Sequence, residues 1–217
     1  MTTRPKADDG RAAAGSAGQP PRGALTFWLE FFRAPTVLGN CFESTAPLAR
    51  AILEGLPLEE AGAVVELGAG TGPVTEHLLP RLGAGARFLA VELNPTLAAA
   101  FRARFPRVAL AEADAGELPR LGAAAGLEPG TVDVIVSTLP FLLFDDATQS
   151  RVLGAAAAVL RPGGIFTTIT NRPAWLMPSV RRFAERMARH VGPVAPVRPV
   201  WRAMPPAYIY RSVKPAD

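Results

Sequence analysis

Three glycines stand close together at positions 68, 70 and 72, in the stretch VVELGAGTG. A residue without a side chain lets the backbone lie against a bound molecule. Glu66 comes just before the first glycine, near the end of a short apolar run. This arrangement predicts a binding loop for a nucleotide-like ligand at the carboxyl end of a buried strand.

Two classes of cofactor compete for such a loop. A dinucleotide loop has the order G-x-G-x-x-G, and its helix N-terminus faces the pyrophosphate. Here Pro73 occupies the position of the third dinucleotide glycine. S-adenosylmethionine has no phosphate, but its ammonium and sulfonium are positive, and a carboxylate such as Glu66 can stabilise that charge. The loop therefore favours S-adenosylmethionine over NAD.

Acidic residues at the ends of the next two predicted strands support the same ligand. Glu92 ends the second strand, where a carboxylate can accept hydrogen bonds from both ribose hydroxyls, although that signal alone also fits NAD. Asp114 follows the third strand, where a carboxylate can accept from the adenine amino group. The fourth strand ends in STLPF, at the edge where the methyl group would point. The predicted cofactor-binding residues are Glu66, Gly68, Gly70, Gly72, Glu92, Leu93, Asp114, Ala115 and Ser137.

The elements that position these residues alternate between strand and helix. Short apolar runs separated by helical stretches predict an α/β fold with a parallel sheet covered on both faces. In the stretch DDATQSRVLGAAAAVL, Asp145 or Asp146 is the expected helix cap. The predicted strands are 63–67, 87–93, 107–113, 131–140 and 164–170, with two more near 197–201 and 207–212.

The flanks differ from this core. Residues 1–22 mix Gly, Ala, Pro, Arg and Asp without an apolar run, which predicts a disordered tail rather than a signal peptide. The next segment, residues 23–62, contains ALTFWLEFFR near its start. The aromatic side chains of this stretch either bury in a membrane interface or pack on the protein's own core. Its aromatic residues are Phe27, Trp28, Phe31 and Phe32. The predicted segments are a disordered tail at 1–22, amphipathic and lid helices at 23–62, and a cofactor-binding core at 63–217.

Charge and composition limit the kinds of partner and binding site that we expect. The net charge is +4, and residues 171–217 carry nine basic and two acidic residues, which fits either an anionic partner or a solvated basic surface. Cys41 is the single cysteine, so we expect no intrachain disulfide and no metal site. No stretch reaches the roughly 18 apolar residues that span a bilayer.

The motif series VVELGAGTG, VELNP, EADA, VSTLPF and LRPGG resembles that of class I S-adenosylmethionine-dependent methyltransferases. The resemblance narrows to the small bacterial phosphatidylethanolamine N-methyltransferases, because FWLEFF, STLPF and PPAYIY stand where that group has its own motifs. It implies a Rossmann-like fold, with a mostly parallel seven-stranded sheet, helices on both faces and a C-terminal antiparallel hairpin. It also implies that Glu66, Gly68, Gly70 and Glu92 hold the cofactor, with Asp114 at the adenine.

The function that the resemblance implies is methyl transfer to phosphatidylethanolamine and its methylated forms, toward phosphatidylcholine, with S-adenosylhomocysteine as the product. Backbone carbonyls near Leu139 and Pro140 are expected to aim the acceptor amine. Tyr208 and Tyr210 are predicted to lie on the same face of a strand. Two roles are possible for them, contact with the lipid headgroup or packing in the core. Arg202 is the expected lipid phosphate contact, with a surface cation as the alternative.

The expected setting is cytoplasmic, at the inner face of the membrane. We expect a monomer whose aromatic helix and C-terminal arginines contact an anionic membrane. These arginines are Arg181, Arg182, Arg186 and Arg189. Nucleic acid is not an expected partner, since no single-strand binding module is visible. An ornithine-lipid, ribosomal RNA adenine or small-molecule methyltransferase stays open as an alternative, as does a cofactor-binding scaffold without turnover.

Overall fold

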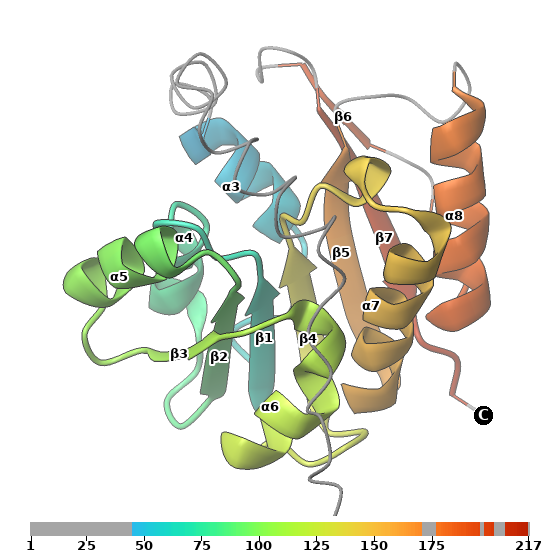
Figure 1. Cartoon of the computed structure of the whole chain (residues 1–217). Helices are drawn as coiled ribbons and strands as arrows, with labels where there is room; N and C mark the ends of the chain where they lie inside the picture. Colours follow the sequence, from blue (N-terminus) through green and yellow to red (C-terminus); the bar gives the residue numbers. More distant parts are fainter. Residues whose placement is uncertain (1–44, 171–176, 196–197, 202–206, 217) are drawn as a thin grey trace, which may run out of the picture.

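The computed structural model describes residues 45–170, 177–195, 198–201 and 207–216. The described strands form a seven-stranded sheet in the order β3-β2-β1-β4-β5-β7-β6 (Figure 1). Strands β1 to β5 run parallel, and β7 runs antiparallel to both of its neighbours, β5 and β6. The strands are β1 Ala63–Leu67, β2 Arg87–Glu92, β3 Ala109–Glu112, β4 Val132–Ser137, β5 Leu160–Thr170, β6 Arg198–Val200 and β7 Ala207–Val213. The predicted fold class is therefore confirmed.

Helices cover both faces of the sheet. In Figure 1, α3, α4 and α5 lie on one side, and α6, α7 and α8 lie on the other. The side chains of β1 show why, because Val64 packs with α3 and α4, whereas Val65 and Leu67 pack with α6, α7 and α8. The helices are α3 Thr45–Leu53, α4 Thr75–Leu78, α5 Pro95–Arg104, α6 Leu118–Ala124, α7 Asp146–Val159 and α8 Pro178–His190, with 3₁₀ turns η1 Leu79–Arg81, η2 Ala115–Glu117 and η3 Phe141–Leu143.

The register of the parallel strands brings their carboxyl ends to one edge. Leu67 at the end of β1 lies beside Val91 of β2 and Ser137 of β4. Ser137 in turn lies beside Thr168 of β5. The loops that leave β1, β2 and β4 therefore start from one level, as a shared binding site requires.

Local signals account for most element boundaries. Asn94 accepts hydrogen bonds from Thr96 N and Leu97 N and caps α5, while Asp145 accepts from Thr148 N at 2.7 Å and caps α7. Asp145 is thus confirmed as a helix cap. The stretch PVTEHLLPRL predicts a helix after the glycine loop that Pro80 limits. The observed helix α4 is shorter, because the chain changes into the 3₁₀ turn η1 at Leu79, next to Pro80, which has no N–H to donate. The residues RPGG at 161–164 predict a turn. This prediction is wrong, since those residues lie within β5.

Candidate active site

The three loop glycines all have positive φ angles, but their surroundings differ. A β-carbon at Gly70 would meet no atom within 4 Å, so this position is open to a ligand. At Gly68 it would lie 2.9 Å from Leu139 Cδ2, and at Gly72 it would overlap the ring of Phe105. Gly72 is therefore required by packing between the loop and the end of α5, whatever it contributes to a cofactor.

Glu66 lies at the foot of this loop and is fully buried. Its Oε2 accepts a hydrogen bond from Thr75 Oγ1 at 2.6 Å, while its Oε1 has no hydrogen-bond partner among the described residues. Burial raises the pKa of Glu66 to about 8. A buried carboxyl with an unused acceptor atom, beside an open glycine, fits a ligand that carries positive charge.

Glu92 joins the end of β2 to the glycine loop. Its Oε2 accepts from Gly70 N at 2.9 Å, and its Oε1 accepts from Asn94 N at 2.8 Å. Burial also raises its pKa above the ordinary value. Each oxygen keeps acceptor capacity, so the carboxylate fits the predicted role of binding two ribose hydroxyls. Leu93 follows it directly and is half-buried.

Asp114, the predicted adenine contact, forms a two-point ion pair with Arg151 of α7. Arg151 Nη1 donates to Oδ1 at 2.8 Å, and Nη2 donates to Oδ2 at 3.0 Å. Oδ1 also accepts from Gly116 N at 2.6 Å. Burial alone would raise the pKa of Asp114, but the hydrogen bonds from Arg151 and Gly116 outweigh it and hold the pKa below the ordinary value. Asp114 is therefore a carboxylate acceptor held in one orientation beside the buried Ala115.

Arg151 did not emerge from the sequence. It lies 37 residues from Asp114, and no local pattern joins the two. The one available signal is Gly116, because a β-carbon there would overlap the Arg151 guanidinium. Glycine at this position keeps the path of the ion pair clear.

The end of β4 turns sharply over the glycine loop. Ser137 is fully buried, and its Oγ accepts from Leu139 N at 3.3 Å. The carbonyl of Leu139 accepts from Phe141 N, and that of Pro140 accepts from Leu143 N, both at 2.9 Å. Each of these carbonyls keeps a second lone pair, which is what the predicted contact with an acceptor amine would use.

Thr138 ties this turn to the glycine loop. Its Oγ1 donates to Gly68 O at 2.6 Å, and its backbone N donates to Leu67 O at 3.0 Å. The side chain of Leu139 packs on Gly68 from the same turn. The structure thus brings together the glycine loop and the STLPF turn, which the sequence assigned to the donor and the acceptor.

The two predicted tyrosines share a face, as expected, but lie at different depths. Tyr208 pairs with Thr170 at the carboxyl end of β5 and is 7% exposed. Tyr210 is fully buried, with its ring 6.2 Å from that of Phe183 on α8. The core-packing alternative therefore describes Tyr210, because no surface of this side chain is available to a headgroup.

The other predicted residues lie away from this site or outside the described residues. Arg202 lies outside the described residues, and so do the aromatic residues predicted to contact the membrane, Phe27, Trp28, Phe31 and Phe32. The assignment of Arg186 to a membrane-facing surface is wrong, because its side chain is only 7% exposed and forms an ion pair with Asp146 at 2.6 Å. In the described part of the chain, no three His, Cys, Asp or Glu side chains gather as metal ligands would.

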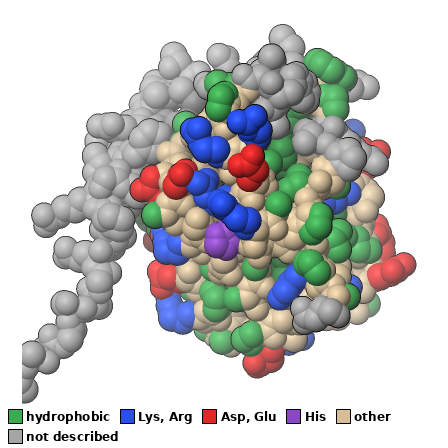
Figure 2. Space-filling view, turned by 90° about the vertical axis from the view of Figure 1, so that its right-hand side faces the viewer, with side chains coloured by type: hydrophobic (Ala, Val, Ile, Leu, Met, Phe, Trp, Pro, Cys, Tyr) green, Lys and Arg blue, Asp and Glu red, His purple; other side chains and the backbone are tan. Residues whose placement is uncertain are grey.

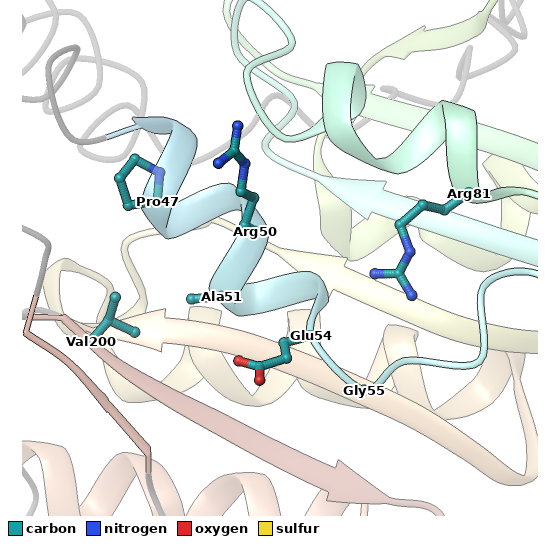
Figure 3. A pocket seen from close by; sticks show the side chains of 7 residues that line it. All are labelled: Pro47, Arg50, Ala51, Glu54, Gly55, Arg81 and Val200. Carbon is teal, nitrogen blue, oxygen red and sulfur yellow. The ribbon is translucent and has the colours of Figure 1, made fainter.

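A pocket between α3 and β6 lies apart from these residues (Figure 3). Arg81 at its border caps the end of α3, because its guanidinium donates to Leu53 O at 2.8 Å and to Leu56 O at 3.1 Å. None of the predicted cofactor residues lines it. The lining residues are Pro47, Arg50, Ala51, Glu54, Gly55, Arg81 and Val200.

Comparisons with known proteins agree with this geometry. Residues 64–164 match a methyltransferase domain family. The chain is 32% identical over 190 residues to the ornithine lipid N-methyltransferase of Singulisphaera acidiphila, and the match covers 85% of this chain and 94% of that protein. It is 33% identical over 120 residues to the ribosomal RNA small subunit methyltransferase A of Acidobacterium capsulatum, but this match covers only 41% of that enzyme.

A solved structure shows the same fold. The 1,6-didemethyltoxoflavin-N1-methyltransferase of Burkholderia thailandensis, with bound S-adenosylhomocysteine, has a TM-score of 0.65 to this chain at 18% identity. The alignment covers 96% of this chain and 97% of that one. With its strand order, its methyltransferase domain and a relative matched over almost its whole length, the chain belongs to the class I S-adenosylmethionine-dependent methyltransferases, and S-adenosylmethionine is its methyl donor.

Proposed function

We propose that the protein transfers methyl groups from S-adenosylmethionine to the amine of a membrane lipid, and that an ornithine lipid is the first acceptor to consider. One observation carries this proposal. The chain matches an ornithine lipid N-methyltransferase over 94% of the length of that enzyme. The sequence motifs ranked phosphatidylethanolamine first. It stays the second candidate, because both lipids present a primary amine beside acyl chains.

The donor supplies an electrophilic methyl carbon on a positively charged sulfur. The protein's part is to align the two reactants and to exclude water. The protonated lipid amine must first release a proton to water as it enters the site, so that its lone pair can face the methyl carbon. The N–C bond then forms as the C–S bond breaks, and the electron pair of that bond stays on sulfur.

The residues at the carboxyl edge divide into two groups in this proposal. Glu66 would favour the positive charge of the donor, Glu92 would bind its ribose, and Asp114 would bind its adenine. Leu139 and Pro140 would offer their carbonyl oxygens to the N–H groups of the acceptor amine. Tyr208 lies at the same edge and would contact the headgroup.

We also propose that the outer face of α8 contacts an anionic membrane. Figure 2 shows Lys and Arg side chains gathered near the centre of the face that includes this helix. The exposed arginines of α8 are Arg181, Arg182 and Arg189. Each basic residue near an anionic leaflet contributes about 1 kcal/mol of attraction. Among the described residues, no helix is long and apolar enough to cross a bilayer.

The test is a panel of acceptors. The full chain is incubated with radiolabelled S-adenosylmethionine and, in separate reactions, with ornithine lipid, phosphatidylethanolamine or ribosomal RNA. We expect label in a lipid fraction, highest with ornithine lipid, and none in RNA. Label in RNA alone would overturn the proposed function while leaving the methyltransferase family intact.

A further inference from the structure

A buried arginine connects α8 to the start of α7. Arg186 is only 5% exposed, and its Nη2 pairs with Asp146 Oδ2 at 2.6 Å. Its Nη1 donates to Gln149 Oε1. A buried guanidinium is costly unless it is paired and hydrogen-bonded, and these contacts supply both conditions.

Gln149 links Arg186 to the turn that follows β4. Its Nε2 donates to Phe141 O at 2.8 Å and to Phe144 O at 3.1 Å. Because Arg186 donates to the amide oxygen, only the NH₂ group is left to face the turn. Arg186 therefore fixes the orientation in which Gln149 can hold both carbonyls.

The same turn also packs against α8 through aromatic rings. Phe141 and Phe183 stack with their ring centroids 5.0 Å apart and an angle of 29° between their planes. Phe141 also makes an edge contact with Phe166 of β5, at 6.2 Å between centroids. The turn is thus held both by polar contacts and by apolar ones.

We propose that Arg186 and Gln149 are positioning residues for methyl transfer. They set the path of the turn that runs from Leu139 to Phe144, and with it the direction of the Leu139 and Pro140 carbonyls. This inference rests on the proposed role of those carbonyls in aiming the acceptor amine. The contacts between the turn and the glycine loop come from Thr138 and Leu139, at the start of the turn. Gln149 holds the later part, at Phe141 and Phe144, so we expect its main effect on the acceptor and not on the donor.

The decisive variant is Gln149→Glu. It keeps the size of the side chain and a partner for Arg186, but it removes the N–H groups that hold Phe141 O and Phe144 O. We expect kcat for lipid methylation to fall about 10- to 100-fold, because a displacement of about 1 Å has an effect of that size. The affinity for S-adenosylhomocysteine, measured by calorimetry, should stay within about twofold of the wild type.

Hydrogen exchange gives a readout that needs no acceptor. The amides of Phe141, Leu143 and Phe144 all donate within the turn, so they are protected in the wild type. Their exchange should become faster in Gln149→Glu. Unchanged exchange would overturn the inference, and so would a kcat within twofold of the wild type.

Two further variants separate the causes. Gln149→Leu removes the same donors without adding a charge, and it should reproduce both changes; a defect in Gln149→Glu alone would overturn the inference. Arg161→Gln is the matched control, because it removes a guanidinium–carboxylate contact with Asp133 that is not part of the turn. It should leave kcat and the exchange of the turn unchanged. If the wild-type protein labels no lipid, the proposed function fails, and the exchange data still decide whether the two residues position the turn.

Discussion

The substitution Glu66→Gln should make the cofactor-free protein more stable at neutral pH. The wild-type carboxyl is fully buried and has a pKa of about 8, against an ordinary value of 4.5. At pH 7.5 the folded state therefore binds a proton that the unfolded state has released. Glutamine keeps the shape of the side chain and has no such proton to bind.

The magnitude follows from proton linkage. A folded-state pKa above the unfolded value gives stability that is fully present below the unfolded pKa and is lost as the pH rises through the folded one. The window for Glu66 therefore runs from about 4.5 to about 8. Over it, the wild-type protein loses up to about 1.4 kcal/mol per pH unit, or about 4 kcal/mol by pH 7.5, through this one group.

The assay is denaturant unfolding of both proteins without cofactor, at several pH values between 4 and 8. All other titrating groups are shared, so the difference in unfolding free energy reports Glu66 together with its repulsion by Glu92, the charge that adds to its raised pKa. We expect this difference to move in favour of the glutamine variant as the pH rises. Parallel stability curves across the window would refute the reasoning, because they would mean that the buried carboxyl has no raised pKa.

Donor binding gives the same prediction a second readout. A cationic ligand beside Glu66 favours the ionised carboxylate, so binding of S-adenosylmethionine near pH 7 should release a fraction of a proton from the wild type. Calorimetry in buffers of different ionisation enthalpy measures this release. The Glu66→Gln protein should release none from this position and should bind the donor more weakly.

Three further predictions test the rest of the site. Arg151→Gln should raise the pKa of Asp114 toward its ordinary value. It should also weaken S-adenosylhomocysteine binding about tenfold, the loss expected for a charge-assisted hydrogen bond. Gly116→Ala should act in the same direction, because its β-carbon would displace the Arg151 guanidinium. Gly68→Ala should destabilise the protein by about 2 kcal/mol or more in denaturant unfolding, since its φ is +77° and its β-carbon would crowd the β4 turn. Replacing the exposed arginines of α8 by glutamine should lower sedimentation with anionic vesicles and leave donor affinity unchanged; equal sedimentation of variant and wild type would remove this face from the membrane proposal. That triple variant changes Arg181, Arg182 and Arg189.

The structure also changes which experiments are informative. Truncation of Leu139 to glycine would test the carbonyl role poorly, because this side chain belongs to the main core and packs on Gly68. Its loss would lower stability by about 2–5 kcal/mol, whatever the carbonyl does. The variants at Gln149 act on the same turn without removing a core side chain.

The fold was predictable because its signals are local. Apolar runs identify the parallel strands, and the acids that follow them mark the carboxyl edge of the sheet. The glycine loop carries its own signal, since a positive φ at Gly70 needs glycine wherever the rest of the chain lies. The family's motifs then supplied the seven-stranded sheet, its C-terminal antiparallel hairpin and the donor.

The contacts that hold the site are not local, and this is why the sequence did not reveal them. The partners Asp114 and Arg151 are 37 residues apart, and so are Gln149 and Arg186. Helical periodicity contained one usable hint, because Arg186 follows Phe183 by three residues and so lies beside the buried stripe of α8. Counting that arginine among the exposed ones overlooked its place on the helix.

The most direct test of the central claim is the location of the transferred methyl group. The full chain is incubated with vesicles of ornithine lipid and S-adenosylmethionine that carries a ¹³C-labelled methyl group, and the extracted lipid is examined by NMR. We predict a ¹³C methyl signal coupled to the protons next to the lipid amine, which identifies an N-methyl product, and none with vesicles that lack an aminolipid. Unlabelled lipid, recovered from a protein that binds S-adenosylhomocysteine normally, would contradict the account.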